Sequence, residues 1–252
     1  MILEKRIKNY WEGEAQAYRA GIQDELKADK RQTWKKIILE NAPVSGAEDK
    51  LNVLDIGTGP GFFPIILGEE GHHVTGIDLT ENMVECAARN AKREKVKVNL
   101  LTMDCHNMNF ADESFDLLIC RNLTWTLDNP EKAYQEWYRV LRPGGRMLIF
   151  DACWYLHLYD EERNRAYQKK EEEILQKYGR RIHEHQDQAE GDALSKKLYM
   201  SDKPRPQWDL NIMLKLGMAK VFADLAVSRL TMEERDLELY DFHRPFMVGG
   251  EK

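Results

Sequence analysis

The 252-residue sequence lacks the features that mark secreted, membrane-spanning and strongly basic proteins. Its four cysteines, Cys86, Cys105, Cys120 and Cys153, are widely spaced and form no Cys-x-x-Cys pair, so we expect a reduced chain. No apolar run approaches the length of a membrane span, and the N-terminus has no apolar signal-peptide segment. The net charge of −6 gives little attraction for nucleic acid or anionic lipid. These absences predict a cytoplasmic protein with no membrane span and no nucleic-acid partner.

A glycine-rich stretch at residues 53–63 organises the rest of the chain. The apolar residues Val53 and Leu54 lead through Asp55 and Ile56 into Gly57-Thr58-Gly59-Pro60-Gly61, and a helix-compatible run follows. Apolar residues that end in glycine are typical of a buried parallel strand. Glycine lets the backbone turn tightly and approach a ligand, and the free N–H groups of the next helix favour an anionic or polar group. The stretch predicts a nucleotide-type binding turn, although glycine is also used there for packing alone.

The spacing of these glycines distinguishes between nucleotides. A dinucleotide-binding turn has Gly-x-Gly-x-x-Gly, and here Phe62 stands where the last glycine would be, which disfavours a nicotinamide dehydrogenase. The sequence instead has Asp-x-Gly-x-Gly-x-Gly, beginning at Asp55. This pattern resembles motif I of the class I S-adenosylmethionine (SAM) methyltransferases.

Alternating strand and helix patterns follow the glycine turn. The predicted strands are residues 73–78, 96–103, 114–122 and 146–151, and the predicted helices are residues 62–70, 81–93 and 129–141. Asp78 ends the second of the five predicted strands, about 20 residues beyond Gly57, where a carboxylate can accept both ribose hydroxyls of an adenosine. Thr80 is placed to cap the following helix, which leaves Asp78 for the ligand.

Two further motifs strengthen the resemblance. The turn Leu141-Arg-Pro-Gly-Gly before a strand and the leader Tyr10-Trp11-x-x-x-Ala15-x-x-Tyr18 are both similar to ubiquinone/menaquinone-biosynthesis-like proteins. With the strand–helix units over residues 51–151, the chain is identified as a member of the class I SAM-dependent methyltransferases of this type (methyltransferase type 11). The resemblance implies an α/β fold with a Rossmann-like, seven-stranded, mostly parallel sheet and helices on both faces. Residues 220–225 and 245–250 would be its antiparallel last strands.

We expect residues 1–252 to form a single methyltransferase domain with four parts. Residues 1–45 are an N-terminal helical cap with two helices separated near Gly21, and residues 46–154 are the SAM-binding core. Residues 155–205 contain a charge-dense helical pattern over 160–181 and a shorter helical pattern over 194–199. Because this segment passes over the C-terminal ends of the predicted strands, where ligands of open α/β sheets bind, we expect it to form a helical lid. Residues 206–252 hold a helix at 208–216 and the last two strands.

The resemblance implies a set of SAM-binding residues, which would also bind the product S-adenosylhomocysteine (SAH). In the family, Tyr18 lies near the methionine end, Asp104 faces the adenine amino group and the Cys105 N–H meets a ring nitrogen, with His106 at the ring's border. The end of the fourth strand reaches the methionine portion and the substrate mouth. The expected cofactor-binding residues are Tyr18, Asp55, Gly57, Thr58, Gly59, Gly61, Asp78, Leu79, Asp104, Cys105, Arg121 and Asn122.

The implied activity is transfer of a methyl group (EC 2.1.1.-) to an N, O or S nucleophile of a small molecule. The sequence assigns no catalytic residue, and His157, Tyr155 and Asp151 are the candidates for a general base near the mouth. The lid aromatics Trp154, Tyr155, Tyr159 and Tyr199 could form apolar or cation–π walls for an acceptor. We expect no metal, since His183 and His185 are two apart and not three or four.

Three other functions fit parts of the pattern. An RNA methyltransferase would have a basic face or an Asn-Pro-Pro-Tyr-type motif, and neither is present. A metalloid methyltransferase would use thiols, but Cys105, Cys120 and Cys153 are not paired in sequence. A non-catalytic SAM-binding protein would share the cofactor motifs. The sequence does not identify the acceptor, the methylated atom, the pathway or the oligomeric state.

Overall fold

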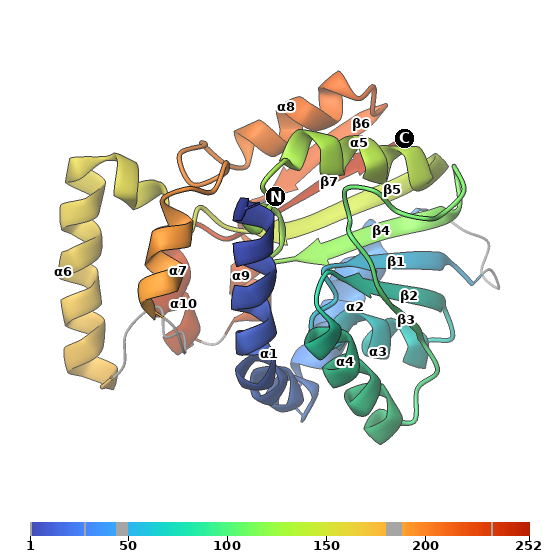
Figure 1. The fold of residues 1–252 in the computed structure, drawn as a ribbon, viewed down its shortest axis with the longest axis horizontal. Coiled ribbons are helices and arrows are strands. Elements are labelled where there is room, and N and C mark those ends of the chain that lie inside the picture. The colour runs from blue at the N-terminus through green and yellow to red at the C-terminus, as the bar shows by residue number, and fades with distance from the viewer. Residues whose placement is uncertain (1, 28, 44–49, 180–187, 233) are drawn as a thin grey trace.

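The computed structural model describes residues 2–27, 29–43, 50–179, 188–232 and 234–252. Its centre is a seven-stranded sheet in the order β3-β2-β1-β4-β5-β7-β6 (Figure 1). Strands β1 to β5 are parallel, and β7 pairs antiparallel with both β5 and β6. The strands are β1 (Asn52–Ile56), β2 (His73–Asp78), β3 (Asn99–Thr102), β4 (Phe115–Arg121), β5 (Leu141–Asp151), β6 (Lys220–Asp224) and β7 (Phe246–Glu251).

Side-chain alternation along these strands builds a core on each face of the sheet. Val53 and Leu117 are buried against helices α2 and α3 on one face, while their neighbours Leu54 and Leu118 are buried against α5 and α8 on the other. The helices are α1 (Ile2–Lys27), α2 (Lys30–Asn41), α3 (Phe62–Glu69), α4 (Glu81–Glu94), α5 (Pro130–Val140), α6 (Glu161–Tyr178), α7 (Gln188–Ser195), α8 (Gln207–Lys215), α9 (Val227–Thr231) and α10 (Glu234–Tyr240). The predicted Rossmann-like, mostly parallel architecture is confirmed.

The N-terminal helix α1 lies across the C-terminal ends of the parallel strands, with α7 and α6 beyond it (Figure 1). The expected break near Gly21 is wrong, because α1 continues to Lys27 and Gly21 is exposed on its surface. Ile22 and Leu26 are buried in the core beyond this glycine, so packing sustains the helix through it. None of the described helices is long and apolar enough to cross a membrane.

Several predicted boundaries are corrected. Strand β3 begins at Asn99 and not at residue 96. Strand β5 begins at Leu141 and not at residue 146, because the Arg-Pro-Gly-Gly segment is part of the strand and forms an irregularity in the pairing of β4 with β5. The second lid helix is α7, which ends at Ser195, before most of the expected 194–199 pattern. The short helices α9 and α10 between β6 and β7 were not predicted. His183 and His185, for which no metal role is expected, lie outside the described residues.

Candidate functional site

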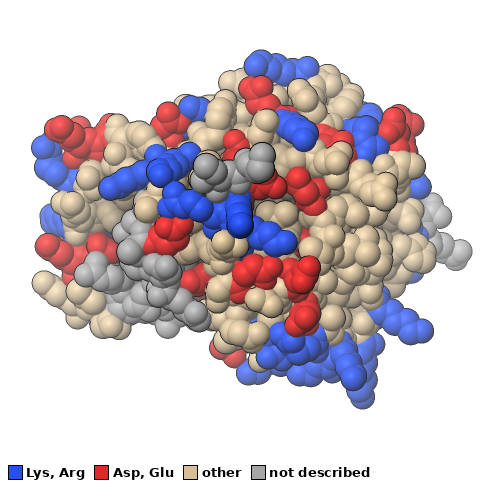
Figure 2. All heavy atoms as spheres, viewed as in Figure 1, with Lys and Arg blue, Asp and Glu red and all other residues tan. Residues whose placement is uncertain are grey.

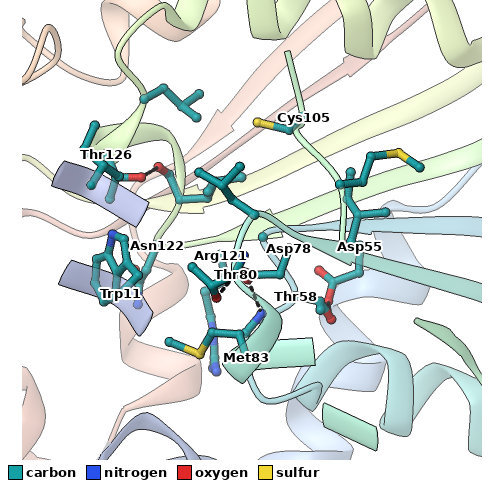
Figure 3. Close-up of a pocket in the computed structure, with 18 of the residues that line it drawn as sticks. Trp11, Asp55, Thr58, Asp78, Thr80, Met83, Cys105, Arg121, Asn122 and Thr126 are labelled. Carbon is teal, nitrogen blue, oxygen red and sulfur yellow. Dashed lines mark hydrogen bonds between the residues drawn. The ribbon is translucent and has the colours of Figure 1, made fainter. Parts of the chain in front are cut away.

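A cavity of about 1190 Å³ of empty space, part of it open to solvent, lies at the C-terminal ends of the parallel strands. Its walls come from α1, the glycine turn and the ends of β2, β3 and β4 (Figure 3). All the expected cofactor-binding residues except Gly61 line it, namely Tyr18, Asp55, Gly57, Thr58, Gly59, Asp78, Leu79, Asp104, Cys105, Arg121 and Asn122. The structure therefore brings together residues that the sequence spreads over a hundred positions.

The first two glycines shape the turn at this cavity. Gly57 and Gly59 have φ of +67° and +49°, a region that other residues rarely adopt. A Cβ on Gly57 would also lie 2.7 Å from Leu123 Cδ1. Gly61 has a φ of +87°, in the same region, and a Cβ there would also lie 2.9 Å from Ala87 Cβ. The third glycine lies behind the cavity wall, where it permits close packing of α3 on α4.

The acid at the end of β2 ties the glycine turn to the neighbouring strand. Asp78 Oδ2 accepts a hydrogen bond from the Gly59 N–H at 2.9 Å. Its Oδ1 accepts from the Thr80 N–H at 3.0 Å and from Thr80 Oγ1 at 2.8 Å. Burial raises the pKa of Asp78, and these hydrogen bonds oppose that shift. The carboxylate thus faces the cavity already oriented by backbone donors.

The N-terminus of α4 is capped by a residue from another helix. The expected side-chain cap by Thr80 is absent, since its hydroxyl is bonded to Asp78. Glu12 of α1 instead accepts hydrogen bonds from the Glu81 and Asn82 N–H groups, each at 3.1 Å. A carboxylate at a helix N-terminus is stabilised by the unpaired N–H groups and the helix dipole. This contact fixes α1 over the cavity, and no local sequence pattern announces it.

The carboxyl of Asp55 lies at the base of the glycine turn. It is buried, and its Oδ2 accepts a hydrogen bond from Thr58 Oγ1 at 2.6 Å. Burial raises the pKa of Asp55 to about 7, while the Thr58 hydrogen bond and the Arg121 charge act in the opposite direction. The protonation state of this group therefore changes near neutral pH.

The turn after β3 places Asp104, Cys105 and His106 on the cavity wall. His106 Nδ1 lies 2.7 Å from Asp104 Oδ1, and its Nε2 lies 3.3 Å from Asp128 Oδ1. The hydrogen bond with His106 lowers the pKa of Asp104. The ligand atoms of Asp104, Cys105 and His106 lie within 4.8 Å of one another. Burial raises the pKa of the Cys105 thiol, which opposes the thiolate that a metal would need.

The charge of the cavity wall is predominantly negative. Its acidic residues are Glu4, Asp55, Asp78, Asp104 and Asp128. Arg121 is the one lysine or arginine among the described lining residues. It is held by Glu25 of α1 at 2.8 Å and lies 4.9 Å from the ring centroid of Phe62. The arginine is thus already engaged by α1 and an aromatic ring.

The three candidate bases lie outside this main cavity. Asp151 is buried beneath it and pairs with Arg205 at 3.1 Å, while His157 stacks on Tyr167 with ring centroids 3.9 Å apart. Tyr155 borders a second, smaller cavity between α1 and α7. That cavity is lined by Ile7, Tyr10, Trp11, Trp125, Thr126, Tyr155, Gly191, Leu194 and Leu198. None of the three candidates is positioned at the main cavity wall.

Comparison with known proteins agrees with this geometry. Residues 54–149 match the family model described as a methyltransferase domain. The chain is 33% identical over 102 residues to a phosphoethanolamine N-methyltransferase of Triticum aestivum, covering 40% of this chain and 20% of that protein. It is 26% identical over 98 residues to a ubiquinone biosynthesis O-methyltransferase of Coxiella burnetii, covering 39% of this chain and 42% of that protein. The chain thus spans less than half the length of these relatives.

The fold extends the likeness to nearly the whole chain. A SAM-dependent methyltransferase from Aquifex aeolicus superposes with a TM-score of 0.55 and 19% sequence identity, covering 92% of this chain and 97% of that one. At this identity the superposition shows the shared fold. Residues 54–149 therefore match a methyltransferase domain, and nearly the whole chain shares the fold of a solved SAM-dependent methyltransferase.

Proposed function

We propose that the chain is a SAM-dependent methyltransferase that acts on an N, O or S nucleophile of a small molecule. The observation that supports this most is the main cavity, which is lined by the glycine turn, by the acids at the ends of β1 and β2, and by the acid that follows β3. Ligands of open α/β sheets bind at these strand ends. On the face shown in Figure 2, basic and acidic side chains are interspersed, without one broad basic area that would favour RNA.

The residues present fit SAM in charge and donor set. The acidic wall of the cavity suits a cofactor with a cationic sulfonium, and the carboxylate of Asp78 is positioned to accept hydroxyl hydrogen bonds. Asp104 and the Cys105 N–H are proposed for the adenine, and Tyr18 and Asn122 for the methionine end.

When bound, SAM supplies an electrophilic methyl group, so the protein's main task is to align the acceptor and exclude water. Such orientation is worth on the order of 7–11 kcal/mol. Helix α1 covers the cavity from the side of the strand ends, and residues 155–205 are proposed to close it as a lid.

The direct test is turnover of SAM to SAH. The purified protein should bind SAM and not NAD in calorimetry, and should form SAH with one of a panel of amines, phenols, quinols and thiols. Transfer to transfer RNA or ribosomal RNA, with none to any small acceptor, would contradict the small-molecule proposal. Tight SAM binding with no transfer to any acceptor would favour a non-catalytic SAM-binding protein.

SAM affinity should depend on the ionisation of Asp55. With its pKa near 7, the carboxyl is mostly neutral below this pH and mostly ionised above it. Because the ionised form favours a cationic ligand, the association constant should rise by up to about tenfold per pH unit between pH 5 and 7 and level off above. Calorimetry from pH 5 to 9 would show this rise, and Asp55→Asn should flatten it.

A control separates this effect from the nearby histidine. His106→Gln removes an imidazole that also lines the cavity and should leave the rise in place. The same shift predicts that the free energy of unfolding falls as pH rises from about 4 to about 7, since the unfolded state ionises first. A pH-independent affinity in the unmodified protein would contradict the assignment of Asp55.

A further inference from the structure

We propose that Thr124 and Asp151 are positioning residues, which together hold the segment after β4 (residues 122–128) in place as a wall of the main cavity. This inference rests on the proposed SAM binding, and it gives Asp151 a role other than that of a general base. In the described part of the chain neither residue lines the cavity, so both act through their neighbours. The residues of the segment that line the cavity are Asn122, Leu123, Thr126, Leu127 and Asp128.

The segment after β4 has little regular structure of its own. It leaves the strand at Asn122, which has a φ of +54° and donates its N–H to the Phe150 carbonyl at 2.8 Å. The 3-10 turn Thr124–Thr126 follows, in which the Thr126 N–H and hydroxyl both donate to the Leu123 carbonyl at 2.9 Å. A single 3-10 turn has poor hydrogen-bond geometry. The segment therefore needs an anchor elsewhere in the fold.

The carboxylate of Asp151, at the end of β5, is that anchor. Its Oδ2 accepts hydrogen bonds from the Thr124 hydroxyl and, at 3.1 Å, from the Trp125 N–H. Its Oδ1 accepts from the Ala152 N–H and from Trp154 Nε1, each at 2.8 Å. Hydrogen bonds to an ionised acceptor are stronger than neutral ones. One oxygen of Asp151 thus holds the segment after β4, while the chain that follows β5 holds the other.

Arg205 fixes the direction of the Thr124 hydroxyl. Its Nη2 donates to Thr124 Oγ1, and a guanidinium has no acceptor, so the hydroxyl directs its own proton to Asp151. Arg205 also pairs with Asp209 at 2.7 Å and with Asp151 at 3.1 Å. Thr124→Val therefore removes the link between the segment and Asp151 but leaves the buried cation with both carboxylates. The variant should fold.

The position of the segment matters to the proposed cofactor site in two places. A Cβ on Gly57 would lie 2.7 Å from Leu123 Cδ1, so Leu123 packs directly against the glycine turn. Asn122 is the residue proposed for the methionine end, and Figure 3 shows it with Thr126 among the lining side chains. Misplacement of about 1 Å by a distant change can cost about 100-fold in catalysis. Displacement of the segment would disturb both contacts.

Calorimetry with SAH tests the role of the Thr124 hydroxyl. Thr124→Val should weaken SAH binding by about tenfold, the order of magnitude of one hydrogen bond to a charged group. Thr124→Ser keeps the hydroxyl and should restore most of the affinity. The matched control is Thr231→Val in α9, which removes a buried hydroxyl that donates to the Val227 carbonyl at 3.1 Å and does not line the cavity. This control should leave SAH affinity unchanged.

Hydrogen–deuterium exchange of the ligand-free protein tests the anchor without SAH. Peptides that span residues 122–128 report on the Trp125 and Thr126 N–H groups, and Thr124→Val should make them exchange faster. Thr124→Ser and Thr231→Val should leave this exchange unchanged. Asp151→Asn keeps the shape of the side chain and leaves Arg205 paired with Asp209, so it should reproduce both effects of Thr124→Val. Circular dichroism would verify that each variant is folded.

Three results would overturn the proposal. These are unchanged exchange of residues 122–128 in both Thr124→Val and Asp151→Asn, unchanged SAH affinity in both, and an equal loss of affinity in Thr231→Val. The unmodified protein is titrated with SAH first. Failure of SAH to bind there would count against the proposed methyltransferase function, whereas the exchange measurement decides separately whether Thr124 and Asp151 hold the segment.

Discussion

Replacing Arg205 by alanine should lower the free energy of unfolding by about 3–5 kcal/mol. The guanidinium is buried beneath the site, with 1% of its side chain exposed, and it pairs with Asp209 at 2.7 Å and with Asp151 at 3.1 Å. Both carboxylates are fully buried, so removal of the arginine leaves two negative charges without their cation. The remaining donors, such as the Tyr134 hydroxyl at 2.6 Å from Asp209, cannot neutralise them.

Urea denaturation followed by circular dichroism would measure this loss as a lower midpoint at an unchanged slope. The matched control is Lys36→Ala, which breaks the exposed ion pair between Lys36 and Glu40. These two residues are four positions apart in sequence, as are Arg205 and Asp209. Pairs of this kind contribute about 0.3–0.5 kcal/mol. If Arg205→Ala lowered the free energy of unfolding by no more than Lys36→Ala, the buried ion pairs of Arg205 would not stabilise the fold as expected.

Asp78→Ala should weaken SAM binding by about 10- to 150-fold. A hydrogen bond to a charged group is worth about 1.5–3 kcal/mol, and each 1.4 kcal/mol is a factor of ten in affinity. The effect has two sources, because the variant loses the proposed ribose contact and also the acceptor that holds the Gly59 N–H at 2.9 Å. Calorimetry at pH 8 would measure the change.

Two variants make the Asp78 result specific. Asp78→Asn keeps the shape of the side chain and one acceptor oxygen, so its loss of affinity should be smaller than that of alanine. Asp24→Ala removes an acid that is 79% exposed and does not line the cavity, and should leave SAM affinity unchanged. An unchanged affinity in a folded Asp78→Ala variant would sink the ribose assignment.

The parts of the fold that sequence predicts well are those encoded by neighbouring residues. The apolar run before Gly57, the capping asparagine at 129 with Pro130 and the acid that ends β2 each follow from local patterns, and the structure contains all three elements. Helix α1 shows the limit of such patterns, since Gly21 weakens a helix locally while the burial of Ile22 and Leu26 sustains it. Tertiary packing therefore explains why α1 continues through Gly21.

Contacts between distant segments account for most of what sequence reasoning missed. Glu12 caps α4 from 69 residues away, and nothing in its surroundings on α1 distinguishes it from an ordinary exposed acid. Asp151 ends a strand as a site residue would, but it pairs with the buried Arg205, which precedes α8, and is therefore part of a structural ion pair. Long-range pairing of this kind becomes visible only when the chain is folded.

Helix α1 contributes residues to the walls of both cavities. Ile7 and Trp11 belong to both walls, Glu12 fastens the helix to α4, and Arg6 fastens it to Glu190 of α7 at 2.8 Å. A ligand of the main cavity that changes the position of α1 would therefore also change the free energy of its contacts with α4 and α7. Thermodynamic linkage makes such a coupling reciprocal, and a coupling of 1–3 kcal/mol is typical, or about 5–150-fold in affinity. Changes at the α1–α4 or α1–α7 contacts would then alter the affinity of the main cavity for its ligand.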